Sequence, residues 1–261
     1  MRPAWALPLC GLWVCGARAV ELKPETVQAF DQYIRETEAR LEQRVAPGGI
    51  FLWVDELPAR AAAVRQGQLA IENRSSGDFV GVPGGLIHDW IGAVFIPGDT
   101  LGKTLALIQD YDHHQDYYKP EVLVSRLVRR RGNDFQVYLR LMKKKVITVI
   151  LDTDYDVRYF PMDGGRCHSR AYSTRIAEVR NAGQRDERVL APGQDSGFLW
   201  RLYSYWRFQE RDGGVYVECE AISLTRVIPT GLGWLIQPII TTLPRESLAS
   251  TLRETRTALQ R

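Results

Sequence analysis

The densest group of titratable side chains lies at 110–116, where two adjacent histidines stand among three aspartates. Histidine and carboxylate side chains are common ligands of metal ions. Adjacent residues point in different directions on a helix, however, and the four histidines of the chain include no pair spaced four residues apart. We therefore interpret His113 and His114 as part of a polar helix end at the mouth of a pocket. We predict neither a metal site nor a cofactor.

Acid–base catalysis would need a titratable side chain inside a pocket. His88, Tyr138, Arg140 and Tyr203 lie in predicted strands and are the residues that could supply one. A lone histidine in a strand is more often structural than catalytic. The sequence also contains no Ser-His-Asp order, G-x-S-x-G motif, phosphate-binding loop or Cys-x-x-Cys motif. We assign no catalytic residue and favour a protein that is not an enzyme.

Arg140 has a second interpretation, because an arginine inside a cup-shaped sheet would bind a ligand carboxylate or phosphate through paired hydrogen bonds. A turn at Gly132-Asn133 would place Ser125 opposite Arg140 and Leu127 opposite Tyr138. We favour the alternative that this face is the solvated outside of the sheet.

A hairpin predicted at 199–226 indicates a pocket wall. Its turn, Asp212-Gly213, is a strong two-residue hairpin signal and sets the register of the two strands. One face then pairs large residues with smaller ones: Trp206 with Cys219, Phe208 with Val217, Leu202 with Ser223, and Ser204 with Ala221. A well-packed core is the alternative, because cores also alternate large and small residues.

The opposite face of this hairpin is predicted to pair Arg207 with Glu218 and Tyr205 with Glu220. An ion pair and tyrosines are typical of a surface in contact with water. We therefore expect this face to be exposed.

Two basic clusters, Arg129–Arg131 and Lys143–Lys145, could contact an anionic membrane surface transiently. The favoured alternative is that they protect strand ends from edge pairing. With 34 Lys and Arg against 31 Asp and Glu, the chain has a formal charge of only +3. That balance offers no electrostatic argument for a nucleic-acid partner.

Residues 1–19 resemble a secretory signal: Arg2 is followed by a short apolar run and an Ala-Arg-Ala ending. Cleavage after Ala19 would make the protein secreted or periplasmic. Cys167 and Cys219 would then remain. We expect both to stay free thiols, because another strand separates the two predicted strands that carry them.

The order of elements predicts an α+β fold. A helix spans roughly 24–45 within an α-rich extension, residues 20–83, and the strand 84–98 follows. Short helices precede a run of about six strands, which turn signals separate at most junctions; whether Lys143–Lys145 is a turn or a bend is left open. A long apolar-striped helix ends the chain.

This order resembles the START-like superfamily (SRPBCC), which includes lipid-transfer domains and polyketide cyclases. The resemblance covers about 84–260, within a domain drawn at 84–261, and includes the phrases LIQDYDHHQDYYKPEVLVSRL and VIPTGLGWLIQP. It implies a helix-grip fold, in which a curved antiparallel sheet of six or seven strands wraps around the C-terminal helix. It also implies an internal cavity for a lipid, sterol, aromatic or polyketide-like molecule, and no shared catalytic residue.

We therefore predict binding, carriage or sensing of a hydrophobic small molecule beneath the C-terminal helix. A cyclase- or aromatase-type enzyme and an interaction domain without a pocket are the alternatives. The predicted ligand-binding residues are Trp200, Leu202, Ser204, Trp206, Phe208, Val217, Cys219, Ala221, Leu235, Ile239 and Leu243.

Overall fold

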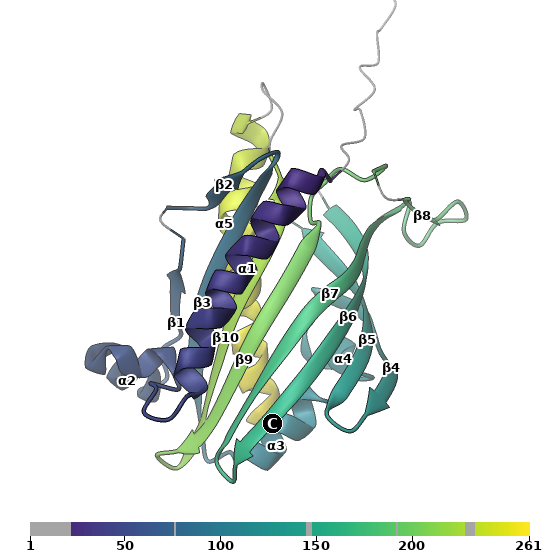
Figure 1. The fold of residues 1–261 in the computed structure, drawn as a ribbon. Helices are drawn as coiled ribbons and strands as arrows, with labels where there is room; N and C mark the ends of the chain where they lie inside the picture. Colours follow the sequence, from purple (N-terminus) through teal and green to yellow (C-terminus); the bar gives the residue numbers. More distant parts are fainter. Residues whose placement is uncertain (1–21, 76, 145–147, 192, 228–232) are drawn as a thin grey trace, which may run out of the picture.

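A curved antiparallel sheet forms the centre of the molecule, with helices on both of its faces (Figure 1). The computed structural model describes residues 22–75, 77–144, 148–191, 193–227 and 233–261, with only the backbone described at 233–241. The predicted signal segment, residues 1–19, lies outside the described residues. Among the described residues, no helix is both long and apolar enough to cross a membrane.

Seven long strands make up most of the sheet, in the order β3-β10-β9-β7-β6-β5-β4, and every adjacent pair is antiparallel. Short strands β1 and β2 pair with β3, and β8 pairs with β7. The strands are β1 (Ala70–Asn73), β2 (Val80–Val82), β3 (Gly85–Pro97), β4 (Val122–Arg131), β5 (Asp134–Lys144), β6 (Thr148–Asp163), β7 (Arg166–Arg180), β8 (Arg188–Val189), β9 (Arg201–Arg211) and β10 (Gly214–Arg226).

The helices form two layers around this sheet. They are α1 (Pro24–Val45), the 3₁₀ turn η1 (Trp53–Glu56), α2 (Pro58–Arg65), α3 (Leu101–Ile108), α4 (His114–Tyr117) and α5 (Gly233–Leu259). Figure 1 shows α1 lying across β3, β10 and β9 on one face, while α5 and α3 lie on the other. A sheet that curves around its C-terminal helix is the helix-grip architecture, so the predicted fold class is confirmed.

The β9–β10 hairpin has the predicted register. Asp212 and Gly213 both adopt positive φ, 57° and 75°, as a tight hairpin turn of this type requires. Trp206 therefore pairs with Cys219, and Ser204 pairs with Ala221. The two thiols, Cys219 on β10 and Cys167 on β7, are free and buried, and β9 runs between their strands.

The prediction that the other face of this hairpin meets water is wrong. Arg207 and Glu218 are 3% and 1% exposed, because α1 covers that face. The helix packs there through an apolar stripe that includes Phe30, Ile34 and Leu41. The N-terminal extension thus forms a packed layer on this face of the sheet.

The predicted pairing of β4 with β5 is also wrong by one residue. An irregularity between Leu127 and Arg129 shifts the register, so Ser125 pairs with Leu139 and Val124 pairs with Arg140. A β-bulge of this kind leaves the alternation of faces intact on each side but changes every partner beyond it. At the other end of β5 the chain reverses, because Lys144 pairs with Thr148; residues 145–147 lie outside the described residues.

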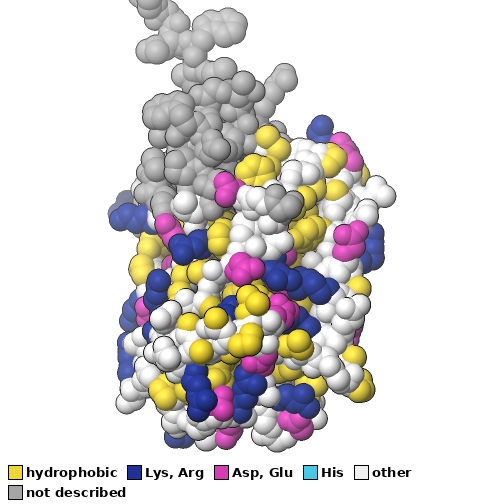
Figure 2. Space-filling view, turned by 90° about the vertical axis from the view of Figure 1, so that its left-hand side faces the viewer, with side chains coloured by type: hydrophobic (Ala, Val, Ile, Leu, Met, Phe, Trp, Pro, Cys, Tyr) yellow, Lys and Arg dark blue, Asp and Glu magenta, His cyan; other side chains and the backbone are white. Residues whose placement is uncertain are grey.

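Charges of both signs are interspersed on the side of the molecule that carries α2 and β1 (Figure 2). Arg60, for example, lies 3.3 Å from carboxylate oxygens of both Glu56 and Glu72. The described residues of this side therefore form a surface of mixed charge, with basic and acidic side chains close together.

Candidate functional site: a cavity beneath the C-terminal helix

A cavity of about 270 Å³ lies between the concave face of the sheet and α5. Its floor is made by β7, β9 and β10, where small side chains leave room: Ser169, Ala171, Ser204, Cys219, Ala221 and Ser223. Larger apolar side chains of β5 and β6, including Leu139 and Val157, form the facing wall. The described part of α5 closes the space with residues that include Leu243 and Leu248.

The structure brings six of the predicted ligand-binding residues to this cavity: Leu202, Ser204, Trp206, Cys219, Ala221 and Leu243. Phe208 and Val217 lie further along the same face and are fully buried in the packed core. Trp200 instead belongs to the buried cluster beneath α1 that includes Phe30. The side chains of Leu235 and Ile239 lie outside the described residues. Ligand binding by these residues stays a prediction.

The four residues considered for acid–base catalysis are absent from the described lining of the cavity. Tyr138 and Arg140 both bind Asp152, each at 2.7 Å, in the arrangement expected of the outer face. Tyr203 packs edge-on against Phe30 of α1, with ring centroids 5.3 Å apart. His88 is buried, and its Nε2 atom lies 3.2 Å from Thr225 Oγ1.

Sequence reasoning missed the aromatic side of the cavity. Tyr111, His114 and Tyr118 come from the segment joining α3 to β4, and Tyr155 and Tyr159 come from β6. The alternation of Tyr155, Val157 and Tyr159 was a usable signal, because residues two apart share a strand face. The irregular segment gave no such signal: only the tertiary fold turns these side chains inward.

Hydrogen bonds within the protein already engage these aromatic side chains. The hydroxyls of Tyr111 and Tyr159 are 2.7 Å apart, and the Tyr118 hydroxyl is 3.1 Å from Thr255 Oγ1. His114 Nε2 donates to the Ile108 carbonyl over 3.1 Å, as part of the same wall. The aromatic wall is therefore pre-organised.

Burial keeps the interior of the cavity uncharged near neutral pH. It raises the pKa of Tyr118 and of Tyr155 to about 12 and lowers the pKa of His114 to about 4. It also raises the pKa of the Cys219 thiol well above its usual value. These four side chains of the wall therefore do not exchange protons readily at pH 7.

The described lining contains three charged residues: Glu121, Lys143 and Glu254. Lys143 forms an ion pair with Glu121 and also donates to Ser247 Oγ at 3.0 Å. The lysine is therefore already neutralised by its neighbour. Among the described residues, no cluster of three or more side chains is arranged to hold a metal ion.

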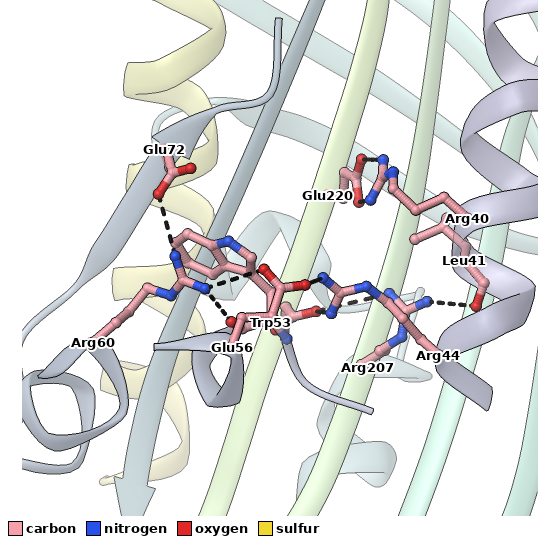
Figure 3. Close-up of polar contacts among 10 residues, drawn as sticks. Arg40, Leu41, Arg44, Trp53, Glu56, Arg60, Glu72, Arg207 and Glu220 are labelled. Atoms are coloured by element: carbon pink, nitrogen blue, oxygen red, sulfur yellow. Dashed lines mark hydrogen bonds and ion pairs between the residues drawn. The ribbon is translucent and has the colours of Figure 1, made fainter. Parts of the chain in front are cut away.

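The opposite face of the sheet carries a buried ionic network that joins α1 and η1 to β9 and β10 (Figure 3). Arg40 pairs with Glu220, and Arg44 pairs with Glu56. The Trp53 backbone N–H donates to Glu218 over 2.6 Å. These contacts orient the N-terminal layer, while the cavity lies on the other side of the sheet.

Asp89 belongs to the same network. It is almost fully buried on β3, and it accepts a hydrogen bond from the Tyr33 hydroxyl at 2.8 Å. Burial, and then the nearby Glu220 carboxylate, raise the pKa of Asp89 to about 8. The network therefore includes a carboxyl group that holds its proton at neutral pH.

No family model and no curated protein matches the sequence. Similar solved structures include a STAR-related lipid transfer protein from Xanthomonas axonopodis, with 16% identity, a TM-score of 0.46, and coverage of 74% of this chain and 99% of that one. Human STARD10 shows 10% identity and a TM-score of 0.45, over 71% of this chain and 72% of that one. The Zhui aromatase/cyclase from a Streptomyces species shows 9% identity and a TM-score of 0.47, over 67% and 94%.

The fold is of the helix-grip type. That assignment follows from the antiparallel strand order and from the position of α5 against the concave face. The sheet carries a layer made by α1 to α2 on its convex face (Figure 1).

Proposed function

We propose that this protein binds and carries a hydrophobic small molecule in the cavity beneath α5. The supporting observation is a space of about 270 Å³, with a largely apolar wall, on the concave face of the sheet. Apolar surface removed from water stabilises a complex by about 25 cal/mol per Å². A ligand that buries about 200 Å² of apolar surface would gain about 5 kcal/mol, before the entropic cost of association.

The alternative of a flush, pocket-less core fits less well, because the small floor residues leave space next to Trp206 that described side chains do not fill. The cyclase-type alternative needs an acid or base of suitable pKa in the cavity. His114 is one candidate on the wall, and its pKa, lowered to about 4 by burial, makes it a weak base. Of the two carboxylates in the described lining, Glu121 and Glu254, the first forms an ion pair with Lys143. Carriage is therefore favoured over catalysis.

Native mass spectrometry of the gently purified protein tests the proposal. The variant Ala221→Phe should fill the cavity, whereas Thr174→Phe adds the same ring on an exposed position of β7. We expect a small molecule to co-purify with the wild type and with Thr174→Phe, but not with Ala221→Phe. Equal recovery from both variants would contradict carriage in this cavity. A bound molecule that the protein converts on incubation would instead support the cyclase.

We also propose that the chain is exported and that residues 1–19 are removed. Support comes from the arginine, apolar run and Ala-Arg-Ala ending of this segment. N-terminal sequencing of the protein recovered from the medium or periplasm should find Val20 first. Recovery of the intact segment from the cytoplasm would contradict export.

Transient contact with an anionic membrane is a further part of the proposal. Arg129–Arg131 and Lys143–Lys144 lie at opposite ends of the β4–β5 hairpin, roughly 30 Å apart, so one flat membrane would meet only one of the two groups. Lys143 lines the cavity, and so the lysine end is the one suited to ligand exchange. Lys144→Glu should weaken co-sedimentation with phosphatidylglycerol vesicles, and Arg130→Glu should not.

A further inference from the structure

We infer that the ligand of this cavity is a compact, uncharged molecule that carries oxygen groups, and that neither a two-chain phospholipid nor a fatty-acid anion is its ligand. This inference rests on the proposed function and narrows it to one chemical class. Three features of the cavity carry it: its charge, its size and the positions of its hydroxyl groups.

The charge of the cavity disfavours an anion. Glu121, Lys143 and Glu254 are the charged residues of its described lining, and together they contribute a net charge of −1. The one cation, Lys143, is engaged by Glu121 and Ser247. A carboxylate placed away from Lys143 would find no other cation in the described lining, and a buried charge without a partner is strongly unfavourable.

The size of the cavity disfavours a two-chain lipid. Its volume, about 270 Å³, is near the lower limit of pockets that enclose drug-sized molecules, about 300–1,000 Å³. Tyr118 and Tyr159 fix part of the wall through hydrogen bonds to Thr255 and Tyr111. Since those contacts hold the rings in place, the space does not widen without breaking them. One compact ring system fits this space, and two acyl chains do not.

Three serine hydroxyls cross the floor of the cavity in a diagonal row. Ser169 pairs with Trp206, two residues from Ser204, and Ser204 pairs with Ala221, two residues from Ser223. Diagonal neighbours of this kind are spaced by about 7–8 Å. Within the described part of the chain, no other side chain or backbone group is hydrogen-bonded to these three hydroxyls.

The serine row therefore provides neutral donors and acceptors on an otherwise apolar floor. A hydroxyl both donates and accepts a hydrogen bond, so it suits an alcohol, phenol or carbonyl oxygen of a ligand. Such groups are few and spaced along the floor, which favours a ring compound with oxygens at separated positions over a plain hydrocarbon.

Binding of two matched probes tests the charge preference. 2-Naphthol and 2-naphthoate share one ring system but differ in charge at pH 7. Quenching of tryptophan fluorescence reports their binding, because Trp206 lines the cavity. We expect 2-naphthol to bind at least tenfold more tightly than 2-naphthoate. We also expect no transfer of phosphatidylcholine from dioleoyl phosphatidylcholine vesicles.

Two variants and one control separate the contribution of the serine hydroxyls from that of the charged residues. Ser169→Ala combined with Ser204→Ala should weaken 2-naphthol binding several-fold and leave naphthalene binding unchanged, whereas the exposed Thr174→Ala should change neither. Glu121→Gln frees the Lys143 ammonium and should strengthen 2-naphthoate binding several-fold. Far-UV circular dichroism checks that each variant is folded.

The outcomes distinguish this inference from the proposed function. Equal affinity for 2-naphthol and 2-naphthoate, or extraction of phosphatidylcholine, would overturn the inference while supporting carriage. Absence of binding by 2-naphthol, naphthalene and 1-dodecanol alike would overturn the proposed function and the inference with it.

Discussion

The rings of Trp206 and Phe208 lie almost parallel, with centroids 6.0 Å apart and an interplanar angle of 6°, yet only Trp206 borders the cavity. Both side chains project from the same face of β9, because side chains two residues apart on a strand point to the same side of the sheet. Phe208 is fully buried in the packed core. The boundary between filled and empty space on this face therefore passes between two neighbouring aromatic residues.

Truncation of these two residues should have different effects. Phe208→Ala leaves a void in a packed core and should lower the free energy of unfolding by about 3–5 kcal/mol. Trp206→Ala enlarges an existing cavity and should cost less than half as much, while it changes the affinity for 2-naphthol. Urea denaturation and probe titration measure the two effects. Equal losses of stability would contradict the position of this boundary.

The sequence was sufficient to predict which residues of β9 and β10 share the face that borders the cavity, because the Asp212-Gly213 turn determines how these strands pair. It did not identify the part of the floor that β7 contributes. It was also sufficient for the fold class, because the strand and helix periodicities are strong in 84–260. The alternation of side chains along a strand identifies the two faces of a strand pair. It does not show which of these faces is covered by another helix or strand.

That limit explains the main error on the outer face. A pair such as Arg207 and Glu218 is typical of an exposed surface, and the docking of α1 and η1 buries it. The bulge near Leu127 could not be predicted either, since no glycine or other local signal marks it. Tyr111 and Tyr118 were missed because the loop that carries them has no periodicity.

The buried Arg207–Glu218 pair leads to a second prediction. Their Nη1 and Oε1 atoms are 3.7 Å apart, with Glu218 held also by the Trp53 N–H. Glu218 keeps a second cation when Arg207 is removed, because Arg44 Nη1 lies 3.8 Å from the same Oε1 atom, and burial raises the pKa of Glu218 to about 7. Arg207→Met should therefore cost about 1–3 kcal/mol of unfolding free energy. Combining it with Glu218→Gln should recover part of that loss. Chemical denaturation of the double-mutant cycle measures the coupling.

The control for this cycle is Arg158→Met on the outer face. Arg158 pairs with Asp134, but its side chain is 61% exposed. Exposed pairs contribute little to stability, because water and salt screen them. A loss for Arg207→Met as small as that for Arg158→Met would show that the network beneath α1 does not depend on this charge.

A third prediction concerns pH. Burial and Glu220 raise the pKa of Asp89 from 3.8 to about 8, so the folded state holds a proton that the unfolded state has released. The contribution of Asp89 to stability is therefore complete below about pH 4 and is lost as the pH rises through about 8. Asp89→Asn removes this dependence and should flatten the fall in stability between pH 6.5 and 8, by at most about 2 kcal/mol.

The histidines give the opposite sign at lower pH. Burial lowers the pKa of His88 and of His114 from 6.5 to about 4, so their contribution is present above about pH 6.5 and is lost as the pH falls through about 4. Measurements above pH 6.5 therefore exclude the contributions of His88 and His114. The hydrogen bond with Asp110 raises the pKa of His113, but that contribution is common to the wild type and Asp89→Asn and cancels in the comparison. Identical slopes for the wild type and Asp89→Asn in that range would contradict the assignment.

The fourth prediction uses the Cys219 thiol as a reporter of cavity occupancy. Cys219 is buried on the floor of the cavity, and burial raises the pKa of its thiol, which leaves little reactive thiolate at neutral pH. A small neutral alkylating agent, used on the chain starting at Val20, should modify it slowly at pH 7 and faster at pH 9. Saturating 2-naphthol should slow the reaction at Cys219 and leave the reaction at Cys167 unchanged, because Cys167 belongs to the packed core and is absent from the described lining. Mass spectrometry of the two cysteine-containing peptides measures both rates in one sample. Protection of Cys167 to the same extent as Cys219 would indicate general stabilisation of the fold, and lack of protection at Cys219 would place the bound probe elsewhere.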